Sequence, residues 1–471
     1  MRYLPNSDAD RAVMLRAIGR RSTDELFAQI PEPLRLQGRL NLPGPLSEPE
    51  ILDFFRQAAS ESSRDYVSLL GAGAYAHFRP AVIEALLSRG EFLTSYTPYQ
   101  AEISQGNLQA MFEFQTLIAQ LTGMEVANSS LYDGSTATNE AVLMALRIAH
   151  QSPGHRDRIV WARSLHPEYR QVVETYVRHQ GVDLREVRAT ASGQIDLQAL
   201  EREVTSETAA VVVQSPNFFG ILEPVAEIAE LAHRAGALLI VTVAEPLSLA
   251  LVKPPIEADI VCGEAQSFGV PVAFGGPYVG FLSTHERFVR QMPGRLVGQA
   301  YDAEGRRGFV LTLATREQHI RREKATSNIC TSQSLFALNA TIYLCLLGKQ
   351  GLRTLAEHNL AKAHYAAAQL RSIGGVTTPF AGPHFNEFVV KAPRDAEDLL
   401  QALREEEKII GGFNLERFYP ELKNHLLVCV TETVSRAALD RMAEVYRRFA
   451  AKAEPSNASS ELQTTPVGRD R

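Results

Sequence analysis

Cysteine and lysine are both scarce in this chain. Only 4 of the 471 residues are cysteine, and no two of them form a C-x-x-C pair, so we predict no metal site and no thioredoxin motif. Reduced thiols are expected, and Cys330, alone in a polar stretch, is more often packing than a nucleophile. All eight lysines follow residue 252, and arginine supplies the positive charge before that.

Charge and hydropathy exclude two further classes. The formal net charge is −6, and no block of lysine or arginine is long enough to follow a phosphate backbone, so nucleic acid is not an expected partner. No run approaches the ~18 apolar residues of a membrane span. The N-terminus lacks the apolar core of a signal peptide. We therefore expect a cytoplasmic protein of metabolic type.

The first 60 residues are predicted to be short helices followed by an extended arm. Ser7 precedes an amphipathic run that Gly19 closes, which is typical of a capped helix, and a second helix is expected from Ser22. Residues 31–49 are rich in proline and leucine. Proline disfavours helices and inner strands, so this segment is expected to be neither and to lie across another surface.

Residues 61–343 are predicted to form a large α/β domain. Helices are expected at 106–121 and from residue 135, followed by strands and helices that alternate: 158–162, 166–179, 209–214, 225–235, 237–243, 260–264 and 278–282. This alternation favours a mostly parallel sheet with helices on both faces. Residues 344–453 read as a smaller α+β domain with helices at 351–373 and 395–407 and strands at 387–391 and 426–430. Residues 454–471 have almost no apolar side chains and are predicted to be disordered.

The segment 261–280, VCGEAQSFGVPVAFGGPYVG, has the layout of a pyridoxal phosphate (PLP) site without its lysine. An apolar strand leads into a polar turn and a glycine-rich loop, and the turn carries Gln266 where a lysine would bind the cofactor aldehyde. An amide nitrogen is not nucleophilic enough for that bond. No covalent PLP chemistry is therefore expected to start at Gln266.

Three further positions bear on such a site. Asp133 to Thr136 opens a helix and could be either a phosphate site or a simple capped turn, although the charge of Asp133 opposes phosphate. The strand that ends at 243 offers Val243 where PLP needs an anion beside its ring nitrogen. Glu245, two residues further on, is a weaker candidate for that role.

Two polar segments are candidate functional loops. Residues 96–106 (YTPYQAEISQG) and 320–333 (IRREKATSNICTSQ) concentrate polar side chains beside apolar structure. Such density is costly unless it is solvated or functional, and the basic side chains of the second segment could hold a carboxylate or phosphate. Solvated surface loops explain both segments as well on local grounds.

Several motifs together resemble the first (alpha) subunit of the glycine decarboxylase, or P-protein, family of the glycine cleavage system. They are YLPNSDADRAVMLRAIG, LGAGAYAHFRPAV, YTPYQAEISQGNLQ, SSLYDGSTATNEA, QSPNFFG and RREKATSNICTSQ, and the resemblance covers residues 1 to about 450. It implies the aspartate-aminotransferase-like fold (fold type I) of PLP-dependent transferases. In this family the second subunit carries the lysine in a turn similar to H-K-T-F-x-x-P. Here that turn reads AQSF, with Pro271 and then Gly-Gly-Pro following.

By this resemblance the lysine position falls on Gln266 and the ring-nitrogen aspartate on Val243, while His166 and Asn217 keep the positions of a ring-facing histidine and a polar turn residue. The cofactor positions of this chain, including Asp133, are therefore expected to be degenerate. No residue of this chain alone is expected to be catalytic. PLP is expected on the partner subunit.

The resemblance implies an enzyme subunit that works only in a complex. Its partner would be the lysine-bearing subunit 2 (beta) in an alpha2beta2 assembly that decarboxylates glycine, releases CO2 and passes the aminomethyl group to the lipoyl group of the H-protein. Active sites of this fold form at subunit interfaces. The residues expected to serve the partner's site are Tyr96, Tyr99, Gln100, Glu102, Gln105, Lys324, Ser327 and Asn328.

Two alternatives stay open at this point. The chain could be an independent PLP enzyme that uses an unexpected lysine such as Lys253 or Lys324. It could also be a purely structural scaffold whose loops never approach a cofactor.

Overall fold

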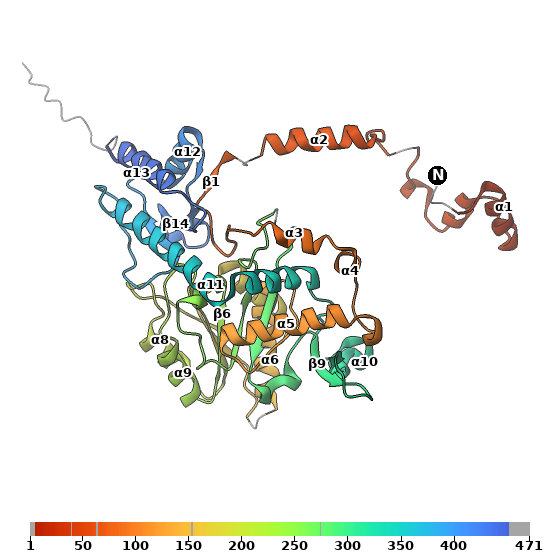
Figure 1. The fold of residues 1–471 in the computed structure, drawn as a ribbon, viewed down its shortest axis with the longest axis horizontal. Helices are drawn as coiled ribbons and strands as arrows, with labels where there is room; N and C mark the ends of the chain where they lie inside the picture. Colours follow the sequence, from red (N-terminus) through yellow and green to blue (C-terminus); the bar gives the residue numbers. More distant parts are fainter. Residues whose placement is uncertain (1–4, 39, 63–64, 152–153, 274, 452–471) are drawn as a thin grey trace, which may run out of the picture. The chain divides into compact units, whose positions relative to one another are not determined.

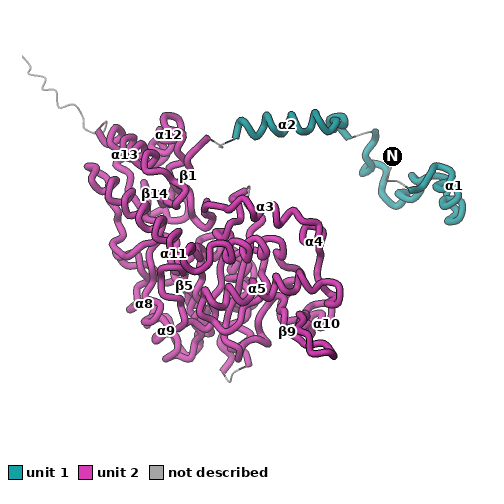
Figure 2. The backbone as a smooth tube through the Cα atoms, viewed as in Figure 1, with its two compact units in different colours: residues 1–64 teal, residues 65–471 magenta. Residues whose placement is uncertain are grey.

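The computed structural model describes residues 5–38, 40–62, 65–151, 154–273 and 275–451, and the ribbon is shown in Figure 1. The chain divides into two compact units, residues 1–64 and 65–471 (Figure 2). The predicted disordered tail, 454–471, lies outside the described residues.

The first unit contains α1 (Asp8–Ala17), two 3₁₀ turns, η1 (Thr23–Phe27) and η2 (Glu32–Leu34), and α2 (Glu48–Ser60). Ser7 caps α1 as predicted, accepting a hydrogen bond from the backbone of Asp10. The prediction that 31–49 contains no helix is wrong at both ends. Pro33 lies within η2, and Pro49 lies in the first turn of α2, where a helix leaves its N–H groups unpaired anyway.

The second unit is built on a seven-stranded sheet of order β2-β8-β7-β6-β5-β3-β4. Its strands are β2 (Val126–Ala127), β3 (Arg158–Ala162), β4 (Asp183–Val187), β5 (Thr208–Gln214), β6 (Leu238–Val243), β7 (Ile260–Glu264) and β8 (Gly280–Thr284). The five strands from β7 to β4 are parallel, whereas β8 and β2 pair antiparallel. The predicted mostly parallel α/β sheet is therefore present.

Helices cover both faces of this sheet, which explains why its strands are almost continuously apolar. Side chains of β5 alternate between the two cores, Val211 and Val213 entering one and Ala210 and Val212 the other. The first core also takes α5 (Gln105–Thr122), α9 (Val225–Arg234) and the first half of α11 (Ser334–Arg371), and the second takes α6 (Gly134–His150) and α7 (Pro167–Val177). The helix α8 (Leu197–Glu203) packs against α9.

A separate apolar core surrounds a three-stranded antiparallel sheet of order β11-β14-β13. It comprises β11 (Glu387–Lys391), β13 (Phe413–Asn414), β14 (His425–Cys429), α12 (Ala396–Glu407), α13 (Arg436–Ala451) and the second half of α11. A two-residue parallel pair joins β1 (Val67–Ser68) to β12 (Ile409–Ile410). The smaller α+β region predicted near the C-terminus has this form.

The helix α11 begins before the predicted helix at 351–373 and contains the predicted domain boundary at 343/344. Its only non-helical residue is Gly348, with φ of 58°. This break lies within the part of the helix that packs on the first core of the seven-stranded sheet, because Leu352 and Ala356 beyond it still belong to that core. The helix joins the core of the three-stranded sheet only from Ala363. Within the described residues α11 is the one helix long and apolar enough to cross a membrane, although 39% of its apolar window is already buried in the protein. Core helices of globular domains share this composition.

The sequence did not predict the β-hairpin of β9 (Leu296–Tyr301) and β10 (Arg307–Thr312) or the short helices α3 (Val82–Leu87), α4 (Gly90–Leu93) and α10 (Gln318–Arg321). The strands β9 and β10 and the helix α3 mix buried, half-buried and exposed positions, and α10 is wholly exposed, so these elements lack the apolar periodicity that sequence reasoning depends on.

Candidate functional site: a filled cofactor pocket

The predicted cofactor positions meet at the carboxyl ends of the parallel strands. Val243 ends β6 and pairs with Gly263 of β7, and Gln266 lies two residues after the end of β7. The backbone N–H of His166, after β3, donates to the side chain of Gln214 at the end of β5 over 2.8 Å. Open α/β sheets bind ligands at this edge.

Gln266 is buried, and its side chain is bonded to the chain itself. Its Oε1 accepts a hydrogen bond from the N–H of Tyr75 over 2.8 Å. Its Nε2 donates to the carbonyls of Tyr75 (2.9 Å) and Val270 (2.6 Å). All three amide functions of Gln266 are thus satisfied by backbone, which fixes the segment around Tyr75 over the turn.

The N-terminus of α6, the predicted phosphate position, already binds a carboxylate. Glu264 Oε2 accepts from the N–H of Gly134 over 2.9 Å, and Oε1 accepts from the N–H groups of Val279 (2.8 Å) and Gln266 (3.0 Å). Asp133 caps the next free amide, that of Thr136, over 2.7 Å. Burial, aided by the charge of Asp133, raises the pKa of Glu264 to about 7. A phosphate dianion has no place beside these two acids.

The ring of His166 is stacked on Tyr169, with centroids 4.4 Å apart and planes 21° apart. Phe218 packs edge-on against the His166 ring. The Nε2 atom of His166 lies 2.9 Å from the carbonyl oxygen of Ala72. Burial, together with Arg170, lowers the pKa of His166 to about 4, so the ring is neutral. A Cβ on Gly134 would lie 2.4 Å from the Tyr169 hydroxyl, so the phenol reaches from His166 to the N-terminus of α6. Tyr169 therefore spans the place of a stacked cofactor ring.

Neither candidate for the ring-nitrogen anion is available. Val243 is wholly buried in the first core. Glu245 binds the imidazole of His77 over 2.9 Å and the amide of Asn386 over 3.1 Å. Asn217 turns its amide to the carbonyl of Gly193 and to Glu223. Each of these side chains serves the fold.

His77 lies between two carboxylates, Glu245 at 2.9 Å and Glu432 at 2.8 Å, with its side chain 1% exposed. Burial alone would lower its pKa, but the two carboxylates outweigh burial and raise the pKa of His77 to about 10. The buried imidazolium thus links Glu245, in the loop after β6, to Glu432, in the loop after β14. Asn359 also binds Glu432, over 2.7 Å.

Residues 71–78 (GAGAYAHF) close the pocket, whereas sequence analysis named them only within a family motif and gave them no role. Glu387 holds it by accepting from the Ala72 N–H (2.7 Å) and the Tyr75 hydroxyl (2.9 Å). Burial raises the pKa of Glu387 to about 7. A Cβ on Gly73 would lie 2.7 Å from His166 Nε2. The run of glycine and alanine was the only sequence signal of this close approach.

The residues present do not fit PLP. The lysine is absent, the phosphate amides bind Glu264, Tyr169 stacks on His166, and segment 71–78 covers Gln266. The alternative lysines do not help: Lys253 is exposed and paired with Glu257, and Lys324 is exposed. Side chains of this chain therefore fill the pocket.

The two polar loops lie against each other at a different place. Tyr99 packs edge-on against His319 at 6.0 Å and lies under the guanidinium of Arg295. Arg295 in turn donates to the carbonyl of Cys330 over 2.7 Å. The structure therefore places the first loop, residues 96–106, beside His319, which directly precedes the second loop, residues 320–333. Arg295 links Tyr99 of the first loop to Cys330 of the second.

Most of the residues predicted to serve a partner's site face solvent within this chain. Tyr96 is 84% and Tyr99 58% exposed, and the other exposed members are Gln100, Glu102, Gln105, Lys324 and Asn328. Gln105 also binds the backbone of Phe309 in β10. Ser327 is half-buried and accepts from the N–H of Ile329. Their roles stay predictions.

The fold of this chain is the fold type I architecture of PLP-dependent enzymes. Burkholderia pseudomallei sphingosine-1-phosphate lyase shares it with a TM-score of 0.64 at 17% identity over 89% of this chain and 93% of that one. A NifS-like protein shares it with a TM-score of 0.61 at 12% identity, over 82% of this chain and 100% of that one. These distant similarities concern the fold alone.

The pattern of the glycine cleavage system P-protein family matches residues 1–446, and the chain belongs to that family. A "probable glycine dehydrogenase (decarboxylating) subunit 1" from Koribacter versatilis is 56% identical over 94% of this chain and 99% of its own length. A protein of the same description from Solibacter usitatus is 51% identical over 98% of this chain and 100% of its own length. A glycine decarboxylase P-protein crystallised in inhibitor-bound form has a TM-score of 0.85 at 43% identity, covering 95% of this chain and 100% of its own.

These similarities confirm the predicted family, the predicted fold and the prediction of an enzyme subunit. Chains called subunit 1 imply a partner subunit, and the fold neighbours indicate that the wider family uses PLP.

Restoring the lysine alone should not restore the cofactor. In Gln266→Lys the Tyr75 and Val270 bonds are lost and a charge is buried, so we expect the free energy of unfolding to fall by at least about 2 kcal/mol. With PLP added, the variant should show no Schiff-base absorbance and no borohydride-trapped adduct on the introduced side chain. A trapped adduct at that position would show that the pocket is open.

Removing the buried imidazolium should destabilise the chain most near neutral pH. His77→Gln leaves Glu245 and Glu432 buried without their cation, which costs about 3–5 kcal/mol. Because its pKa is raised to about 10, the stability that His77 contributes is full below about pH 6.5 and is lost as the pH rises through 10. Urea denaturation at pH 7 and 10 should show the difference between wild type and variant shrinking. Exposed His179→Gln is the control, and an equal effect there would contradict the assignment.

Proposed function

We propose that this chain is the cofactor-free alpha subunit of glycine decarboxylase. With a lysine-bearing subunit 2 that carries PLP, it would form the active site that decarboxylates glycine, releases CO2 and transfers the aminomethyl group to the lipoyl group of the H-protein. An alpha2beta2 assembly in the cytoplasm follows from the same proposal.

The observation that carries the proposal is the filled pocket. A chain whose Gln266, Glu264 and Tyr169 close their own cofactor site can contribute to PLP chemistry only through another chain. Its exposed tyrosines, Tyr96 and Tyr99, and the adjoining loop around Asn328 are suited to that contribution, because they are polar or amphipathic groups presented by a rigid α/β scaffold.

A division of labour predicts activity only in the mixture. Exchange of carbon between glycine and bicarbonate should be at background for this chain with PLP and H-protein, and for subunit 2 alone, and should appear when both are combined. In the mixture, Tyr96→Ala or Asn328→Ala should lower exchange by about tenfold or more, because positioning groups at the reacting centre are lost.

Tyr176→Ala, a partly exposed tyrosine on α7, is the matched control and should leave exchange unchanged. Full exchange by the Tyr96 and Asn328 variants in an intact complex would favour a scaffold. Exchange by this chain alone would overturn the division of labour.

The N-terminal unit supports the proposal of a partner subunit. None of the helices described in residues 1–64 has a buried residue. On α2, Ile51, Phe54 and Phe55 follow i, i+3, i+4 spacing and are 41%, 60% and 64% exposed. A contiguous exposed apolar face of this kind marks an interaction surface. We assign it to subunit 2.

Charges on this face should weaken the complex. We expect Phe54→Glu with Phe55→Glu to raise the Kd for subunit 2 by about 30-fold, the loss of roughly 2 kcal/mol from aromatic contacts. Sedimentation velocity of the mixed subunits would measure it. Ser60→Glu is the control. Ser60 lies nine residues after Ile51, which is about two and a half helical turns, so its side chain is on the opposite side of α2 and the variant should bind as wild type does. Equal Kd values for all three proteins would remove α2 from the interface.

A further inference from the structure

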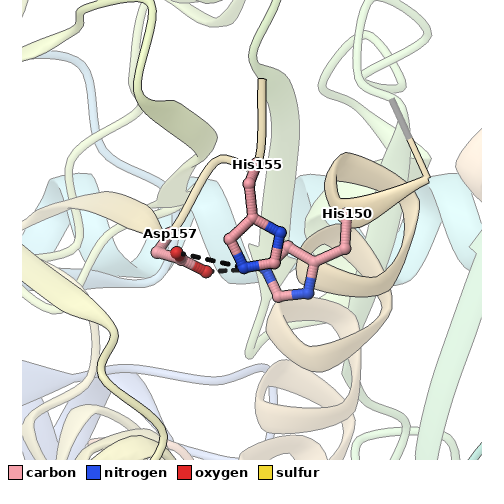
Figure 3. Close-up of side chains that lie close together, drawn as sticks. All are labelled: His150, His155 and Asp157. Carbon is pink, nitrogen blue, oxygen red and sulfur yellow. Dashed lines mark hydrogen bonds and ion pairs between the residues drawn. The ribbon is translucent and has the colours of Figure 1, made fainter. Parts of the chain in front are cut away.

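Two histidines and an aspartate converge at the end of α6 that lies away from the pocket (Figure 3). His150 is the last residue of α6, and Asp157 immediately precedes β3, with His155 between them. His150 Nε2 lies 2.6 Å from Asp157 Oδ1, and His155 Nε2 lies 3.5 Å from Oδ2. The imidazoles stack with centroids 4.0 Å apart and planes 18° apart. Both rings thus direct Nε2 to the same carboxylate.

The surroundings favour a cation at this point. The C-terminus of a helix carries partial negative charge, and Asp157 adds a full one. The neighbouring arginines are engaged elsewhere: Arg156 donates to the carbonyl of Gly236, and Arg158 binds Asp183 over 2.8 Å. Across the described residues, the imidazoles are the only side-chain groups paired with Asp157.

The donor set and its spacing suit a transition metal. Nitrogen and oxygen ligands of tetrahedral Zn²⁺ lie about 2.0–2.2 Å from the ion, which places them about 3.3 Å from one another. His150 Nε2 lies 2.6 Å from one oxygen of Asp157 and His155 Nε2 lies 3.5 Å from the other. One ligand atom from each of the three residues lies within 4.8 Å of the others, so side-chain rotation would bring the three donors to the spacing around one ion. Imidazole nitrogen selects Zn²⁺ and its neighbours over Mg²⁺ or Ca²⁺.

Access is open. The side chains of His150, His155 and Asp157 are 37%, 69% and 36% exposed. An ion bound by them would keep positions for water, and little desolvation opposes its entry.

We propose that His150, His155 and Asp157 form a divalent transition-metal site of the Zn²⁺ class, which joins the end of α6 to the start of β3. The site lies one helix length from the filled pocket: α6 has 17 residues, or about 26 Å. Its metal would therefore act on the stability of the α6–β3 connection and would take no part in glycine chemistry. The sequence analysis predicted no metal site because the cysteines form no C-x-x-C pair, and it did not consider this histidine and aspartate spacing.

Metal-free, tag-free chain titrated with Zn²⁺ against a chromophoric chelator tests the proposal. We expect one ion per chain, a higher thermal midpoint on binding, and a visible ligand-field band when Co²⁺ replaces Zn²⁺. His150→Ala with His155→Ala should weaken binding by at least about tenfold and abolish the rise in midpoint. Asp157→Asn should weaken it as well. Exposed His179→Ala is the matched control and should bind as wild type does.

The two histidines are exposed and Asp157 is half-buried, and equal circular dichroism and equal midpoints without metal would show that the variants are folded. Equal affinity and stoichiometry in wild type and the double variant would place any bound metal elsewhere and overturn the proposal. So would Zn²⁺ binding that leaves the midpoint of the wild type unchanged.

Discussion

The hydrogen bonds of Glu264 are the interaction on which the rest of the pocket depends. One carboxyl group accepts from the backbone of α6, of the turn after β7 and of the segment before β8. A helix N-terminus attracts an anion, and in this chain the protein supplies it. The pocket therefore differs from a PLP site by more than the absent lysine, because the fold uses the N-terminus of α6 for its own cohesion.

Two further side chains help Glu264 to fill the pocket. Tyr169 provides a ring for His166, and Gln266 exchanges a nucleophile for an amide that pairs with both backbone groups of Tyr75. Buried polar groups are costly unless each is bonded. An empty pocket is destabilising unless side chains fill it, and Glu264, Tyr169 and Gln266 fill this one.

Much of this was predictable from the sequence because the signals were local. The strands at 158–162, 260–264 and 387–391 have the predicted limits, since continuous apolar runs bounded by turns specify buried strands. The missing lysine was visible at Gln266 because a motif surrounds it. What fills the pocket was not predictable: Tyr75 lies 191 residues from Gln266, and nothing in GAGAYAHF indicates where it packs. The role of Glu264 was hidden for a similar reason, because an acid in a strand gives no sign that it faces a helix N-terminus.

The same physics explains why such a subunit would keep an elaborate fold. Loops that serve another chain must be held in place, and the segments around Tyr99 and Cys330 are joined through Arg295 beside α5 and the β9–β10 hairpin, which Gln105 fastens together. These elements pack on the domain of the seven-stranded sheet. At the carboxyl ends of its parallel strands, Glu264 and the ion pairs of His77 with Glu245 and Glu432 fill the pocket. A closed pocket is rigid without a ligand, and a rigid pocket keeps the loops preorganised. A filled pocket is therefore compatible with the proposed contribution of these loops to the site of another chain.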